Sequence, residues 1–119
     1  MKTGIRKLVF MLCLPLMALS CTTQSTLYSW GSYQEASYQY MKSNTDQDLD
    51  KLLVRYQYII DNQKKGRKVV PPGIYADYGF LLVKKGRVEE GLKLMKMEVA
   101  LYPESAVFVG RIIKRIEDK

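Results

Sequence analysis

The feature that most constrains the fold is a run of apolar residues with helical spacing in the middle of the chain. Thr45 followed three residues later by Asp48 resembles a capping box, with Asp in place of the usual Glu, and indicates a helix start. Apolar residues then recur every three or four positions, which places them on one helix face. They are Leu49, Leu52, Leu53, Tyr56, Ile59 and Ile60. This pattern predicts an amphipathic helix that ends near Lys65 and Gly66.

Proline and glycine divide the rest of the chain into further helices. The spacing predicts a first helix from Tyr33 to Lys42. Pro71-Pro72-Gly73 separates the next helix, with Pro72 in its first turn, and Tyr102-Pro103-Glu104 separates the last one. The residues expected to face the core of the last three helices are Ile74, Tyr75, Tyr78, Leu81 and Leu82, then Val88, Leu92, Met95 and Val99, then Ala106, Val109, Ile112, Ile113 and Ile116. The sequence predicts an all-α fold of about five helices, arranged as antiparallel hairpins and without strands.

A leader precedes these helices. Three cations near the start of the chain are followed by an apolar run over residues 8–19, which is too short to span a bilayer and is typical of a secretory signal. The run ends at Ser20 and Cys21, and a small residue directly before a cysteine resembles a lipobox. We therefore expect a lipoprotein signal peptide over residues 1–20 and a lipid on Cys21. An ordinary secretory leader, in which Cys21 is incidental, is the alternative.

The number of cysteines supports lipidation. Cys13 lies within the leader, so Cys21 is the only cysteine of the mature chain and cannot form an intramolecular disulfide. Acylation would remove a thiol that is a liability in an oxidising periplasm. Each buried CH₂ contributes about 0.8 kcal/mol, so two or three acyl chains would hold the protein at a membrane. Thr22, rather than Asp, follows the cysteine and resembles an outer-membrane sorting signal. We expect the periplasmic face of the outer membrane, and the inner membrane or the cell surface are the alternatives.

Removal of the leader leaves one small domain with a modest positive charge. We expect a flexible tether over residues 21–27 and a helical domain over residues 28–119. The full chain has 19 Lys and Arg against 12 Asp and Glu, and without the three leader cations 16 remain, a net charge of +4.

The positive charges gather near the predicted helix ends. The first cluster is Lys64, Lys65, Arg67 and Lys68. Helix capping and solubility are one interpretation, and contact with an anionic lipid surface or an acidic partner is the other. We expect no nucleic-acid partner, because the chain is exported and carries no recognisable nucleic-acid motif.

The residue types argue against catalysis. The sequence has no histidine, and its mature cysteine is the predicted lipid site, so the commonest general base, metal ligand and thiol nucleophile are all missing. Asp46, Asp48 and Asp50 alternate as at the start of a calcium loop, but Lys51 and Gln57 occupy the positions that require Gly and Glu. We expect no enzyme, no metal and no cofactor other than the covalent lipid.

Aromatic residues are the other candidates for a binding surface. The chain has nine tyrosines and one tryptophan, and most should lie in the core with their hydroxyls near the surface. The alternative is that Tyr28, Trp30, Tyr33 and Tyr78 line a groove or an interface for a partner protein.

Residues 72–105 resemble one tetratricopeptide unit, which consists of two helices, a tight turn and a closing proline. When the prolines are aligned, Tyr75 falls at the first aromatic position and Gly79 at the glycine where the paired helices approach. Gly91 falls at the next small position, and Glu98 departs from the pattern at the last one. The resemblance implies a helical hairpin that stacks on its neighbours.

The chain also resembles a family of small uncharacterised Gram-negative lipoproteins. The segments that carry the resemblance are Trp30-Gly31, Pro71-Pro72-Gly73-Ile74-Tyr75-Ala76-Asp77-Tyr78-Gly79 and Tyr102-Pro103-Glu104-Ser105. Members are commonly encoded beside a lipoprotein similar to the curli-secretion channel, so the resemblance implies an envelope protein as partner and no catalytic residue. We expect a lipid-anchored interaction module that is accessory to an envelope assembly or secretion complex. A protein that binds the membrane surface or cell wall through its basic clusters is the alternative.

Overall fold

The computed structural model describes residues 1–4, 26–64 and 66–119, so Cys21, Lys65 and most of the expected leader and tether lie outside the described residues. From residue 26 onward the described chain is helical and contains no strand, which confirms the predicted all-α fold. The helices are α2 (Tyr33–Ser43), α3 (Asp46–Asp61), α4 (Ile74–Lys84), α5 (Val88–Leu101) and α6 (Ala106–Glu117), with the 3₁₀ turn η1 (Pro103–Ser105) before α6. Among the described helices, none combines the length and the apolar character needed to cross a bilayer.

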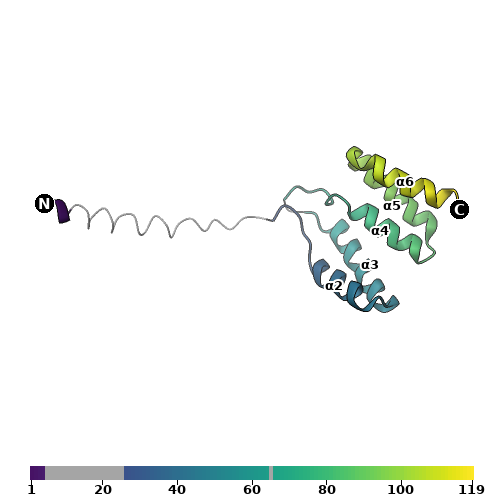
Figure 1. Ribbon diagram of the computed structural model, residues 1–119, viewed down its shortest axis with the longest axis horizontal. Helices are drawn as coiled ribbons and strands as arrows, with labels where there is room; N and C mark the ends of the chain where they lie inside the picture. Colours follow the sequence, from purple (N-terminus) through teal and green to yellow (C-terminus); the bar gives the residue numbers. More distant parts are fainter. Residues whose placement is uncertain (5–25, 65) are drawn as a thin grey trace.

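Successive helices pack as neighbours, with α3 between α2 and α4 and α5 between α4 and α6 (Figure 1). The most extensive interface joins α4 and α5. A Cβ atom on Gly79 would lie 2.5 Å from the Gly91 carbonyl oxygen, and one on Gly91 would lie 2.4 Å from the Gly79 oxygen. Only glycine at both positions allows the two backbones to approach this closely. The structure therefore confirms the close helix approach at Gly79 that the tetratricopeptide resemblance implies.

The predicted apolar stripes form the core. One buried cluster joins α3, α4 and the turn between them, and its members are Leu49, Leu52, Leu53, Tyr56, Ile59, Val70, Ile74, Tyr78 and Leu82. A smaller cluster joins α5 and α6 through Met95, Val109 and Ile113. The prediction was wrong for Val88, which is 40% exposed because it begins α5 at the edge of the hairpin.

Two predicted boundaries also differ from the structure. Helix α3 ends at Asp61, several residues before Lys65, because the backbone of Asn62 leaves the helical conformation, with φ −112° and ψ 21°. The Asn62 side-chain amide caps this end by donating to the Tyr58 carbonyl at 2.8 Å. Pro72 lies before α4 rather than in its first turn, since the left-handed backbone of Gly73 delays the helix start to Ile74.

Candidate functional site

The segment before α2 is bound to Gln63, which lies two residues after the end of α3. The Gln63 side chain accepts a hydrogen bond from the Ser29 backbone N–H at 3.1 Å and donates one to the Ser29 carbonyl oxygen at 3.0 Å. The same amide nitrogen donates to the Ile59 carbonyl oxygen at 2.9 Å. Gln63 is buried, so these bonds are shielded from competing water. A single side chain therefore holds residues that lie 34 positions away in the sequence.

The loop after α3 completes this attachment. The Arg67 backbone N–H donates to the Leu27 carbonyl oxygen at 3.1 Å, and the Arg67 guanidinium donates to the Tyr28 hydroxyl at 3.2 Å. Gly66 has a φ of +67°, and a Cβ there would lie 2.2 Å from the Leu27 oxygen, so the loop requires glycine. We call the surface formed by residues 26–30, Lys64 and residues 66–68 the N-terminal corner.

The N-terminal corner unites two sets of residues that the sequence singled out separately. Lys64, Arg67 and Lys68 of the basic cluster are exposed there, and Lys65 lies outside the described residues. Trp30 is exposed in the same corner, as is Leu27. Cations beside apolar and aromatic side chains can contact a surface that is both anionic and apolar.

The four aromatic candidates lie along one chain of ring contacts. Ring centroids are 6.0 Å apart for Tyr28 and Trp30, and 5.8 Å apart for Trp30 and Tyr33. Tyr56 links Tyr33, at 5.2 Å, to Tyr78, on which it stacks at 5.6 Å. Tyr28 and Trp30 thus reach the surface, while Tyr78 supports them from the core. The helical periodicity assigned Tyr56 to the core only, so the sequence did not predict that Tyr56 links Tyr33 to Tyr78.

The buried part of this chain is a structural support. The hydroxyls of Tyr33 and Tyr56 share a hydrogen bond of 3.3 Å. Burial, helped by this hydrogen bond, raises the pKa of Tyr56 far above its ordinary value, and burial also raises the pKa of Tyr78. Both side chains therefore stay neutral across the physiological pH range, and the pair cannot serve as a base.

A second surface lies between α4 and α6, which flank α5. A groove of about 670 Å³ is lined by Phe80 and Val83 of α4, by Val88 at the start of α5, and by the facing side of α6. Phe80 and Phe108 remain 50% and 71% exposed on this surface. We call it the α4–α6 groove. The apolar stripes in the sequence do not reveal it, because both phenylalanines lie outside the stripes predicted for their helices.

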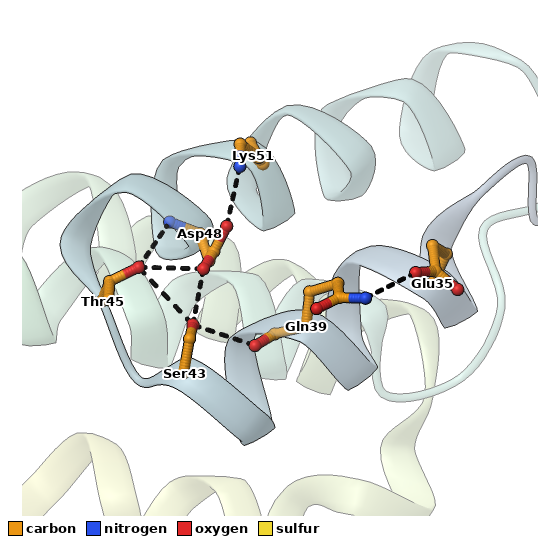
Figure 2. A network of polar contacts seen from close by, with 6 residues as sticks. All are labelled: Glu35, Gln39, Ser43, Thr45, Asp48 and Lys51. Carbon is orange, nitrogen blue, oxygen red and sulfur yellow. Dashed lines mark hydrogen bonds and ion pairs between the residues drawn. The ribbon is translucent and has the colours of Figure 1, made fainter.

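The aspartate run near the start of α3 contributes to helix capping. In the described part of the chain, no three His, Cys, Asp or Glu side chains converge as metal ligands would. Figure 2 shows that Asp48, the middle member of the aspartate run, lies at the start of α3, where it accepts hydrogen bonds from Ser43, Thr45 and Lys51. These bonds lower the pKa of Asp48 to about 2, with the Lys51 bond as the largest cause. The capping function predicted from Thr45 and Asp48 is confirmed.

The comparisons with known proteins identify the family. No curated protein and no solved structure matches the chain. Residues 27–112 match the family described as Domain of unknown function (DUF4810). The match begins in the N-terminal corner, extends into α6, and covers more than two thirds of the 119 residues. The chain therefore belongs to the family described as Domain of unknown function (DUF4810).

Proposed function

We propose that the protein is a lipid-anchored, non-enzymatic interaction module on the periplasmic face of the outer membrane. It is accessory to an envelope assembly or secretion complex. The observation that supports this proposal best is the N-terminal corner, where the backbone of residues 27–29 is hydrogen-bonded to the helical domain. A lipid on Cys21 would thereby be linked to one defined face of the domain.

The covalent distance from Cys21 to Leu27 limits how far this face can lie from a membrane. An extended chain spans at most about 3.6 Å per residue, so Leu27 lies within roughly 20 Å of the acylated cysteine. The five helices lie to one side of the corner (Figure 1), which leaves the far side of the domain free for a partner. In this orientation Lys64, Arg67 and Lys68 face the headgroups, and Trp30 lies at the interfacial depth that tryptophan prefers.

Cell fractionation and mass spectrometry of the full-length chain test the anchor. The mature chain should be found in the outer-membrane fraction, with its N-terminal peptide carrying acyl chains on Cys21. Cys21→Ser should abolish the lipid and release the chain from that fraction. Cys13→Ser is the matched control, because it removes a leader cysteine and should change neither result. An unmodified N-terminal peptide, or Cys21→Ser protein that remains in the membrane, would contradict the proposal.

Affinity purification from membranes in a mild detergent tests the partner. An envelope protein, such as a lipoprotein similar to the curli-secretion channel, should be recovered reproducibly with the tagged full-length chain. The tag alone, exported with the same leader and anchor, provides the background. Repeated recovery of no envelope protein above that background would count against an accessory function.

Direct binding to anionic lipid or to cell-wall glycan is the second candidate function. It is favoured by the three exposed cations that share the N-terminal corner with the exposed Trp30 and Leu27. Co-sedimentation with anionic liposomes and with isolated sacculi should decrease when Lys64, Lys65, Arg67 and Lys68 are changed to alanine. Alanine at Lys42, Arg55, Lys93 and Lys114 removes the same charge elsewhere and is the control. Binding that survives 0.5 M salt would contradict this candidate, since such salt screens exposed charges beyond about 3–10 Å.

A further inference from the structure

The α6 wall of the α4–α6 groove consists of two parallel rows of side chains. One row is apolar and contains Phe108, Ile112 and Ile116, and the other is cationic and contains Arg111, Arg115 and Lys119. Within α6, members of each row are four residues apart, so they lie on the same side of the helix and follow one another at about 6 Å. Lys119 continues the cationic row just after α6 ends at Glu117. The apolar row therefore extends for about 12 Å along the groove, and Arg111 and Arg115 lie about 6 Å apart beside it.

The opposite wall is apolar and partly uncovered. Phe80 and Val83 of α4 face the α6 rows across the groove, together with Val88. Phe80, Val88 and Phe108 are all at least 40% exposed. Single exposed apolar residues are common, but several that line one groove indicate a binding site.

The charge along the groove is of one sign. None of its lining residues is a carboxylate. The ion pairs within the described part of the chain are formed by Lys51, Lys85, Arg87 and Lys96, so no acidic side chain there neutralises the cationic row. Three positive charges thus border an apolar surface and form no ion pair within the described residues, and a ligand with acidic groups would provide the partners.

We propose that the α4–α6 groove binds an acidic amphipathic helix of a partner protein. The apolar face of that helix lies between Phe80 and Phe108, and its carboxylates follow Arg111, Arg115 and Lys119. Side chains four residues apart on the docking helix also repeat at about 6 Å, so its rows match the apolar row of α6 and the Arg111–Arg115 spacing. This inference rests on the proposed interaction function, and it names the chemistry by which the partner is recognised.

Two other occupants fit the groove less well. A second copy of the mature chain would bring a net charge of +4 toward a row of cations, so the average electrostatic interaction is repulsive. A lipid chain needs enclosure on most sides, yet Phe80 and Phe108 leave the groove open to water. A single headgroup would also neutralise only part of a row of three cations.

A designed peptide tests the proposal directly, whatever the identity of the partner. The probe is a fluorescent helical peptide of about 14 residues, or roughly 21 Å, with Leu and Glu in adjacent rows of four-residue spacing. A matched peptide carries Lys in place of each Glu. The full chain, processed in cells and reconstituted in phosphatidylcholine nanodiscs, should bind the acidic peptide at least about tenfold more tightly in fluorescence anisotropy.

Surface variants locate the binding site. Phe108→Ala should weaken binding of the acidic peptide about tenfold, because it removes an aromatic anchor. Val107→Ala, which truncates an exposed neighbour outside the groove lining, should not. Arg115→Glu should also weaken binding about tenfold, whereas Lys114→Glu makes the same charge change outside the groove lining and should have little effect. All four side chains are exposed, and circular dichroism should show each variant folded.

Three results would overturn the proposal. The first is equal binding of the acidic and basic peptides, or no binding of either. The second is acidic-peptide affinity that Phe108→Ala and Arg115→Glu leave unchanged. The third is another occupant: self-association of the wild type that Phe108→Ala abolishes, or binding to anionic vesicles that Arg115→Glu reduces and Lys114→Glu does not. Since the Cys21→Ser experiment does not involve the groove, failure of the anchor and failure of the groove remain distinguishable.

Discussion

At the scale of single residues, Glu98 of α5 is unusual because it is a carboxylate that is only 1% exposed. One of its oxygens accepts a hydrogen bond from the Gly73 backbone N–H at 2.7 Å, directly before α4 begins. The Glu98 carboxyl group thus lies at the N-terminus of α4. The other oxygen has no hydrogen-bond partner within the described residues. Glu98 therefore connects α5 to the proline turn through one strong bond.

We expect Glu98→Ala to destabilise the domain by about 2–4 kcal/mol, because it leaves the Gly73 N–H unpaired and opens a cavity. Glu98→Gln keeps an acceptor of the same shape and should cost less. Urea unfolding followed by circular dichroism measures both variants. A Glu98→Ala variant as stable as the wild type would show that this bond contributes nothing.

Glu98 also influences the pKa of Asp77 in α4. Partial desolvation, with a further contribution from Glu98, raises the pKa of Asp77, although the residue is exposed on α4. A raised pKa in the folded state means that ionisation of Asp77 opposes folding. Its contribution to stability is therefore greatest in acid, and decreases as the pH rises from the ordinary pKa of 3.8 through the folded value.

At the scale of elements, the turn between α2 and α3 is held by side chains from both helices (Figure 2). Ser43, the last residue of α2, donates to Asp48 at 2.5 Å, and Lys51 donates to the same carboxylate at 2.8 Å. Thr45 accepts from the Asp48 backbone N–H at 3.2 Å and caps α3. Asp48 thus fixes both the start of α3 and its junction with α2.

The α3 cap should give the domain a defined acid sensitivity. The pKa of Asp48 is lowered from 3.8 to about 2, so its contribution is fully present above the ordinary pKa and is lost as the pH falls from about 4 to 2. Thermal unfolding over that pH range should show a fall in stability that Asp48→Asn reduces. Asp46→Asn is the control, because Asp46 lies in the same first turn without these bonds.

Loss of the Thr45 cap should be measurable at neutral pH. We expect Thr45→Ala to cost about 0.5–2 kcal/mol, the usual range for an N-cap.

The acid-sensitivity prediction for Asp48 has a clear contradicting outcome. If Asp46→Asn flattened the pH profile as much as Asp48→Asn, the assignment of the acid sensitivity to the cap would be wrong.

At the scale of the whole molecule, Gln63 is the main connection between the N-terminal segment and the helices. Its side chain satisfies both backbone groups of Ser29. Gln63→Ala should leave these groups unpaired and release residues 27–30 from the domain. The expected cost is about 1–3 kcal/mol, and the helices should remain folded.

Hydrogen exchange and tryptophan fluorescence measure this release directly. Amides of residues 28–30 should exchange faster in Gln63→Ala, and Trp30 emission should shift to the red as the ring becomes more hydrated. Gln34→Ala, at an exposed position of α2, should change neither signal. Unchanged exchange in Gln63→Ala would mean that Arg67 and the aromatic contacts hold the segment by themselves.

Much of the fold follows from local patterns in the sequence. The apolar spacing of residues 49–60 predicts α3, and the breaks at Pro71-Pro72-Gly73 and Tyr102-Pro103 divide the later helices. Gly79 and Gly91 indicate a close hairpin from their positions in the sequence pattern. These signals are local because helix periodicity, caps and breaks each involve residues within about one or two turns.

By itself, the amino-acid sequence determined the helical class, the breaks between helices, the capping of α3 and the residues of the main core. Only the tertiary structure decided which surfaces exist. The N-terminal corner depends on Gln63 and Arg67, which bind residues 34 and 39 positions away, and the α4–α6 groove depends on how α4 and α6 flank α5. No local sequence pattern relates residues that are 34 or 39 positions apart. They are set by packing of the whole chain, which leaves Phe80 and Phe108 exposed across one groove and gathers the aromatic and basic candidates in one corner.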